Sequence, residues 1–179
     1  MPYRLRAMGV ELGHDIRFYG MPIVRVTKGS SIRIGNRVVI CSDSRFTDLG
    51  VNHPVVLRTL RKGASIVIGD DTGISGGAIC AAAKVEIGNE CLLGANVTLV
   101  DTDFHATKSE GRRFNKDEAL IATAPVVIES NVFIGTGAIV LKGVRVGSNS
   151  IIGAGSIVAK NVAANEIWSG NSAHFLKTI

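Results

Sequence analysis

The sequence of 179 residues is poor in aromatic residues, which make up 5% of it, and its three cysteines show no CxxC spacing. An odd number of widely spaced cysteines argues against a disulfide framework and against a zinc site. The aromatic shortage and the modest net charge of +5 argue against a base-stacking surface for nucleic acid. We therefore expect reduced, buried cysteines (Cys41, Cys80 and Cys91), no nucleic-acid partner and no bound metal.

Long apolar runs are also missing. No stretch approaches the roughly 18 apolar residues of a membrane span, and the opening segment MPYRLRAMGVELG lacks the apolar part of a signal peptide. We expect a cytoplasmic protein without a membrane span. The hydrophobic content of 46% nevertheless predicts a folded domain with a sizeable core.

Glycine is abundant, with 21 residues, and an internal repeat accounts for much of it. Every sixth position from residue 128 is isoleucine or valine, namely Ile128, Ile134, Val140, Val146, Ile152 and Val158. The next residue is most often glycine. A period of six fits neither an α-helix nor a simple alternating strand, but it fits a short strand followed by a turn. Such hexapeptides are typical of a parallel β-helix, whose stacked coils bury the aliphatic positions.

The same period recurs upstream at Ile68, Ile74 and Cys80 and, after one extra residue, at Ile87, Leu93 and Leu99. It is interrupted at residues 47–63 and 101–125. The second interruption is 25 residues long and mostly polar, and a loop of that length inside a compact repeat is typically functional. We predict one domain, with a cap or edge segment at 1–33, a β-helix at 34–163 and a C-terminal tail at 164–179.

Three segments together resemble the hexapeptide-repeat acyltransferases: IGNECLLGANVTLVDTDFHA, then APVVIESNVFIGTGAIVLKGVRVGSNSIIGAGSIVAKNV, then a Gly-Asn-Ser-Ala tail. The resemblance covers roughly residues 64–179, and the sequence of this part is similar to galactoside and maltose O-acetyltransferases. The segment GVNHPVVLRTL is similar to the polysaccharide-modifying members of the family. It implies an all-β, left-handed parallel β-helix, a triangular prism with three hexapeptides per coil and an extended loop at about 101–125. It also implies a homotrimer that takes acetyl-CoA as its acyl donor.

Through this resemblance His105, in the motif DTDFH at the start of the long loop, is the expected catalytic residue. Imidazole titrates near neutral pH and can accept the proton of a hydroxyl group as its oxygen attacks a thioester. Asp103 is the second catalytic candidate. It could hold the imidazole in one orientation, as in a catalytic triad, or only cap a turn. Asp101 is expected either to share that role or to bind the acceptor.

The resemblance places acetyl-CoA along the C-terminal coils. The residues implied to contact it are Phe133, Gly135, Thr136, Ala154, Gly155, Ala159, Lys160, His174 and Lys177. The amide N–H of Thr136 is implied to stabilise the oxyanion, and Lys160 to reach phosphate groups. The chain departs from the family at Phe133, where tryptophan is common.

The acceptor side is less defined, because the segment ISGGAICAAAKV lacks the polar residues of the sugar acetyltransferases. The candidates for acceptor binding are Ser75, Asn96, Asp101, Arg113 and His53. The pair Arg112-Arg113 suits an acidic saccharide or a sugar nucleotide, or else forms part of a solvated loop.

The leading hypothesis is O-acetylation of a sugar or polysaccharide precursor, and the alternative is N-acetylation of an amino sugar or another small amine. A third possibility is a non-catalytic or zinc-dependent β-helix. Carbonic anhydrases of the γ type need three histidine ligands, and only His105 lies in a suitable place.

Overall fold

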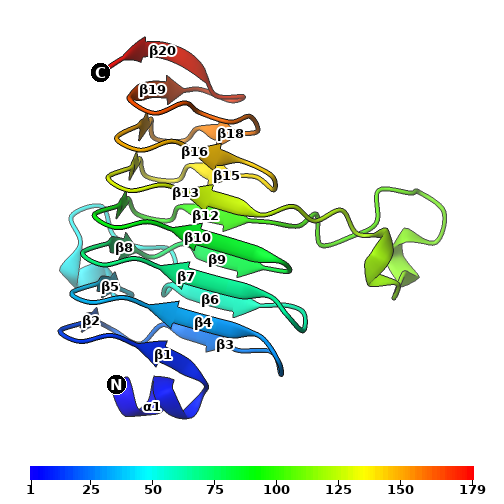
Figure 1. Ribbon diagram of the computed structural model, residues 1–179, viewed down its shortest axis with the longest axis horizontal. Helices are drawn as coiled ribbons and strands as arrows, with labels where there is room; N and C mark the ends of the chain where they lie inside the picture. The colour runs from blue at the N-terminus through cyan, green and yellow to red at the C-terminus, as the bar shows by residue number, and fades with distance from the viewer.

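A computed structural model describes residues 1–179 of the protein and consists almost entirely of short strands wound into a prism (Figure 1). Helix α1 (Pro2–Ala7) covers the N-terminal end, and the antiparallel pair β19 (Glu166–Ser169) and β20 (His174–Thr178) closes the C-terminal end. No helix has the length and apolar character needed to cross a bilayer.

Three parallel sheets form the faces of the prism. Sheet A contains β1 (Val10–Leu12), β4 (Ser31–Ile34), β7 (Ser65–Ile68), β10 (Lys84–Ile87), β13 (Val126–Ile128) and β16 (Arg145–Val146). Sheet B contains β2 (Arg17–Tyr19), β5 (Val39–Cys41), β8 (Gly73–Ser75), β11 (Leu92–Leu93), β14 (Phe133–Ile134) and β17 (Ile151–Ile152), followed by β19 and β20. Sheet C contains β3 (Ile23–Arg25), β6 (Val56–Thr59), β9 (Ala78–Ala81), β12 (Thr98–Val100), β15 (Ile139–Val140) and β18 (Ile157–Val158).

Consecutive strands lie on successive faces, so each coil runs through sheets A, B and C in turn. The chain therefore makes six coils, from coil 1 (β1–β3) to coil 6 (β16–β18), and turns at three corners, A/B, B/C and C/A. This arrangement is the left-handed parallel β-helix that the repeat and the resemblance predict.

The aliphatic positions of the repeat point into the prism. Val85 of coil 4, for example, pairs with Ile66 of coil 3 and Val126 of coil 5, and all three side chains are fully buried. They belong to a single core of 32 buried residues that runs along the prism axis. Because neighbouring strands are only about 4.8 Å apart, each coil covers the aliphatic side chains of the next.

The β-helix begins at Val10, not at residue 34 as the sequence predicts. Val10 pairs with Ile32, which is 22 positions later, whereas Ile128 pairs with Val146, 18 positions later. Extra turn residues in the first coil shift the six-residue period and hide it. The interruption predicted at 47–63 likewise contains a strand, β6, so the projecting insertion is confined to residues 42–55, between β5 and β6.

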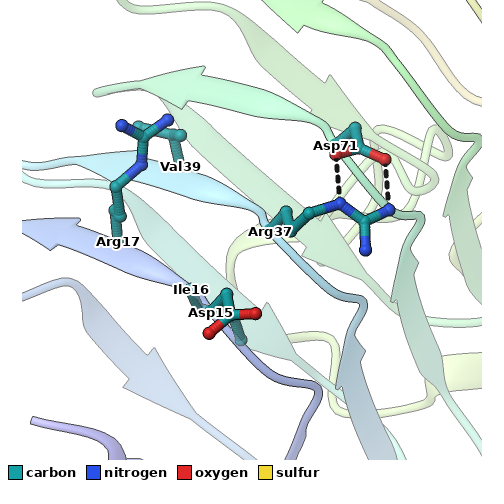
Figure 2. A pocket seen from close by; sticks show the side chains of 6 residues that line it. All are labelled: Asp15, Ile16, Arg17, Arg37, Val39 and Asp71. Atoms are coloured by element: carbon teal, nitrogen blue, oxygen red, sulfur yellow. Dashed lines mark hydrogen bonds and ion pairs between the residues drawn. The ribbon is translucent and has the colours of Figure 1, made fainter.

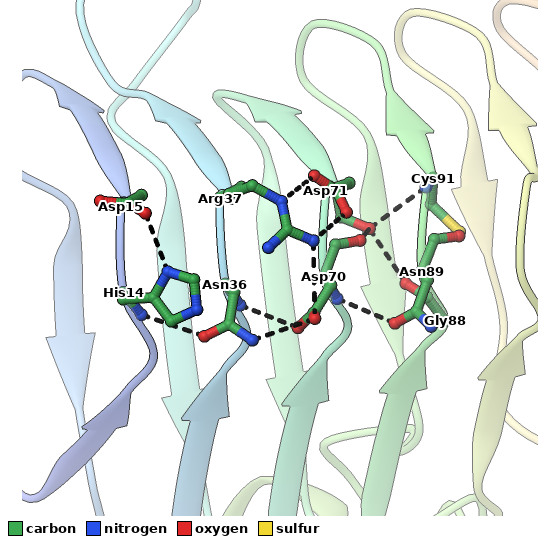
Figure 3. A network of polar contacts seen from close by, with 10 residues as sticks. His14, Asp15, Asn36, Arg37, Asp70, Asp71, Gly88, Asn89 and Cys91 are labelled. Atoms are coloured by element: carbon green, nitrogen blue, oxygen red, sulfur yellow. Dashed lines mark hydrogen bonds and ion pairs between the residues drawn. The ribbon is translucent and has the colours of Figure 1, made fainter.

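The A/B corner is held by a ladder of hydrogen bonds from backbone to side chain (Figure 3). The amide of His14 donates to Asn36 Oδ1 at 3.1 Å, and the amide of Asn36 to Asp70 Oδ1 at 2.8 Å. The amide of Asp70 donates in turn to Asn89 Oδ1 at 2.9 Å. The ladder satisfies amides that the sheets leave without a partner at the turn.

Candidate active site

The long loop leaves the prism at the C/A corner, between β12 and β13, and extends away from it (Figure 1). It carries two short 3-10 helices, η2 (Arg112–Phe114) and η3 (Glu118–Leu120). Its two ends are joined by a bridge between Thr102 and Thr123 and by a 2.9 Å hydrogen bond from the Ala124 amide to the Asp101 carbonyl. We call these two joined ends, residues 101–103 and 122–124, the loop root, and His105 lies two residues beyond it.

Asp101 fastens this root to the coil before it. Its carboxylate accepts hydrogen bonds from the amides of Ala82, Ala83 and Lys84, each at 2.7 Å. The residue is 0% exposed. The role predicted for Asp101 at the acceptor is therefore wrong, because its side chain is enclosed and its oxygens are bonded to the backbone.

Asp103 is half-buried and tied to the coil that follows the loop. Its Oδ1 atom lies 2.6 Å from Nζ of Lys142, which is the second residue after β15. Its amide donates to the carbonyl of Ala122 at 3.1 Å. The Asp103 carboxylate thus braces the loop root against coil 5 through Lys142, where the sequence predicts either a bond to His105 or a turn cap.

His105 itself is exposed, and its main chain is held by a tight turn in which its amide donates to the Asp103 carbonyl at 2.7 Å. Phe104, between them, has φ = 61°, a left-handed conformation that bulky residues rarely adopt. Residues held in such conformations cluster at functional sites. The backbone around His105 is therefore constrained while its imidazole faces solvent.

A cavity of about 160 Å³ lies beside this turn. It is lined by Leu60, Arg61, Ala82, Thr102, Phe104, Glu118 and Ile121. An ion pair of 3.2 Å between Arg61 and Glu118 links coil 2 to the loop. Ligand sites for small molecules usually enclose about 300–1,000 Å³, so this cavity alone is too small to hold a sugar and a thioester.

A larger hollow, of about 580 Å³, lies elsewhere, between the A/B corner and sheet B (Figure 2). It is lined by Asp15, Ile16, Arg17, Arg37, Val39 and Asp71. Arg37 donates to both oxygens of Asp71, at 2.7 and 2.6 Å, and these bonds hold the pKa of Asp71 below its usual value. None of the predicted site residues lies there, so we place the chemistry at the loop root instead.

Most other predicted residues gather at the B/C corner. The amide of Asn96 donates to the Ser75 carbonyl at 2.9 Å, and the amide of Gly155 to the Thr136 carbonyl at 2.8 Å. The insertion reaches the same corner, because the amide of Asn52 donates to Asn96 Oδ1 at 2.8 Å. The neighbouring His53 is exposed, with Nδ1 at 2.8 Å from the Pro54 carbonyl.

Some of the residues expected to bind acetyl-CoA offer free amides at this corner. The amides of Thr136 and Ala154 donate to no main-chain carbonyl. A Cβ atom at Gly135 would lie 2.5 Å from the Ala154 nitrogen, so only glycine fits between these two coils. Ala159 and Lys160 follow β18 at the C/A corner, and both are exposed. These free amides and the exposed lysine suit a long polar and anionic ligand.

The remaining predicted residues are spread more widely. Phe133 is 45% exposed on the outer face of sheet B, and His174 and Lys177 are exposed on β20. Arg113 is exposed in η2 of the loop. Within one chain, Asp103, His105, Ala159 and Lys160 therefore lie at the C/A corner. The free amides of Thr136 and Ala154 lie at the B/C corner, on the opposite edge of sheet C.

Lys142 is the site residue that the sequence analysis misses. It stands two positions after the aliphatic Val140, just as Lys160 stands two positions after Val158. Both lysines thus share one phase of the repeat and lie at the C/A corner. Comparing residues by phase could have singled out Lys142, although its partner across the loop could not be identified in this way.

Comparisons with known proteins agree with this architecture. Residues 125–160 match the family model described as bacterial transferase hexapeptide (six repeats). The comparison with curated protein sequences gives no match. Among solved structures, the chain is similar to the hexapeptide-repeat containing acetyltransferase VCA0836 from Vibrio cholerae, with 22% identity and a TM-score of 0.64, covering 98% of this chain and 78% of that one.

Two further solved structures have the same fold. The polySia specific acetyltransferase NeuO is 23% identical, with a TM-score of 0.60, covering 94% of this chain and 85% of that one. A mutant of AntD, an N-acyltransferase from Bacillus cereus, is 18% identical, with a TM-score of 0.64 and coverage of 99% and 88%. Residues 125–160 thus carry the repeats of this family model, and the chain as a whole has the left-handed parallel β-helix fold of these solved structures.

Proposed function

We propose that the chain transfers an acetyl group from acetyl-CoA to a hydroxyl group of a sugar or polysaccharide precursor, with His105 as general base. The observation that carries this proposal is the placement of His105, an exposed imidazole on a constrained turn at a loop root braced by Asp101 and Asp103. The fold supports it, since VCA0836 has been solved in complex with acetyl-CoA and AntD with coenzyme A.

The chain's residues suit each part of this reaction. Bound acetyl-CoA supplies an acetyl group activated as a thioester. His105 accepts the proton of the acceptor hydroxyl while that oxygen forms the new C–O bond at the thioester carbonyl. The Thr136 amide donates to the carbonyl oxygen as negative charge develops there. As the C–S bond breaks, His105 returns the proton to the sulfur, which leaves an acetyl ester and CoA with a free thiol.

We infer that a complete site forms between two subunits of a homotrimer. His105 and Thr136 lie at opposite edges of sheet C, so one chain alone does not bring the base to the free amide. The loop also projects away from its own prism (Figure 1), which leaves it free to contact a second copy. A native mass of three chains, measured by light scattering, is the expected result, and a monomer that is fully active would contradict it.

An amine acceptor is the second candidate. The likeness to AntD, an N-acyltransferase, favours it, and the same imidazole can take a proton from an amine that attacks the thioester. The two products differ chemically: once the remaining acetyl-CoA has been removed, alkaline hydroxylamine cleaves an O-acetyl ester, whereas an N-acetyl amide survives.

The test is release of CoA thiol from acetyl-CoA over a set of neutral, acidic and amino sugars. We expect His105→Ala to lower kcat by roughly 10²–10⁴-fold while the Kd for acetyl-CoA is unchanged. His14→Ala is the matched control, because His14 is also exposed but lies at the A/B corner. Turnover that survives in His105→Ala would remove this residue from the mechanism.

A further inference from the structure

Sheet C carries charge of only one sign. Its six strands contain no aspartate or glutamate, and their only charged residues are Arg25 at the end of β3 and Arg58 in β6. Both arginines are exposed on the outer face. The rest of that face is apolar or carries only threonine and cysteine, so the two guanidinium groups dominate its field.

The two arginines are also direct neighbours. Arg25 and Arg58 are register partners on the parallel strands β3 and β6, one coil apart. Neither takes part in any ion pair of the chain. Like charges directly opposite each other destabilise a sheet. On sheet A, by contrast, Arg33 opposes Glu11 and its Nε lies 2.8 Å from a Glu11 carboxylate oxygen.

This pair of arginines lies in line with the loop root. Across sheet C, Arg58 of β6 is the register partner of Cys80 in β9, and Cys80 is the register partner of Val100 in β12. Val100 directly precedes Asp101, where the loop root begins. Burial raises the pKa of the Cys80 thiol, and the positive charge of Arg58, its register partner on the neighbouring strand, opposes that rise. Two strand spacings, roughly 10 Å, separate Arg58 from the coil that carries His105. Figure 1 shows β6, β9 and β12 stacked toward the loop.

We propose that Arg25 and Arg58 form an anion-binding site for the acceptor, so that the substrate is an anionic sugar whose charge is a carboxylate or a diphosphate. This inference rests on the proposed function, because it places the acceptor on the N-terminal side of His105. The guanidinium fork matches a carboxylate or phosphate with two parallel hydrogen bonds. Two forks one coil apart can hold two charges of one acceptor, and the repulsion between them is relieved when the anion binds.

The test compares three acceptors with the full-length protein: a hexuronic acid trisaccharide, the same trisaccharide with its carboxyl groups reduced to alcohols, and a nucleoside-diphosphate hexose. We expect the preferred charged acceptor to lose about 10- to 100-fold in kcat/KM in the variant Arg25→Gln/Arg58→Gln, mostly through KM. The reduced trisaccharide should lose nothing. Arg17→Gln is the matched control, since Arg17 is an exposed arginine on sheet B. Melting temperature is a second readout, which should stay equal or rise in the double variant.

Binding of the two charged probes, measured by calorimetry with CoA present, separates the two proposals. Binding of a charged probe that needs both arginines, without transfer to any acceptor, would support the anion site and refute the acetyltransferase proposal. Transfer that prefers the reduced trisaccharide, or that the double variant leaves unchanged, would overturn the anion site alone. Absence of binding by both charged probes would overturn it as well. The charged probe that binds more tightly shows whether the site recognises a carboxylate or a diphosphate.

Discussion

Nζ of Lys142 lies 2.6 Å from Oδ1 of Asp103, and this contact joins coil 5 to the root of the loop that carries His105. The two side chains are 34% and 30% exposed, so the pair is neither fully solvated nor fully enclosed. Asp101 holds the same root to coil 3 through backbone amides. The turn before His105 is thus braced from both sides of the loop.

We expect Lys142→Met to reduce turnover by up to about fivefold, because an ion pair of this kind is worth up to about 1 kcal/mol and its loss frees the loop root. The Kd for acetyl-CoA and the melting temperature should change little, since Lys142 acts only by positioning. Lys142→Arg should restore most of the activity. Lys84→Met, which removes an exposed ion pair with Glu86 on sheet A, is the control. Equal losses in the two Met variants would argue against a positioning role.

Replacing Asp101 by asparagine should destabilise the fold. The carboxylate accepts three hydrogen bonds from backbone amides, and an amide NH₂ group would face at least one of these donors. Bonds to a charged group contribute about 1.5–3 kcal/mol each, and an unsatisfied buried donor costs a similar amount. We expect a loss of about 3 kcal/mol in urea unfolding. Asp103→Asn should lose less than half of that, and equal losses would contradict the structural assignment of Asp101.

Acid should weaken the insertion between β5 and β6. Hydrogen bonds from Arg45 lower the pKa of Asp43 to about 2, below the unfolded value of about 3.9. A depressed pKa in the folded state means that the stabilisation is present above the unfolded pKa and is lost as the pH falls through the folded one. The melting temperature should therefore fall between pH 4 and pH 2. Asp43→Asn should melt lower at pH 7 and show a shallower decline, and parallel curves would refute the assignment.

The sequence predicts the C-terminal coils well because each hexapeptide there is complete. Ile128, Ile134 and Val140 fill successive faces of one coil without an extra residue. Coil 1 escapes detection because its turns are longer, so Val10 and Ile32 fall out of the period. The six-residue period identifies buried positions only where the turns between strands have a constant length. The insertion between β5 and β6 breaks this condition, so the sequence pattern does not predict β6 either.

The candidate site divides in a similar way. The motif around His105 predicts a residue at the loop root, and the structure places it there. The sequence could not separate the roles of Asp101 and Asp103, since two residues of equal chemistry stand two positions apart. Their difference arises from long-range packing: one carboxylate turns inward to the amides of coil 3 and the other meets Lys142 of coil 5.

Two adjacent residues of β14 offer a direct test of the inward register. Ile134 is fully buried, whereas Phe133 is 45% exposed on the outer face. Ile134→Asp would bury a carboxylate without a partner, which should cost several kcal/mol and prevent stable folding. Phe133→Asp places the same charge on the surface and should keep the β-helix circular dichroism signal and a melting temperature within a few degrees of the original. Since side chains alternate between the two faces of a strand, a reversal of these two outcomes would mean that the strand is shifted by one residue.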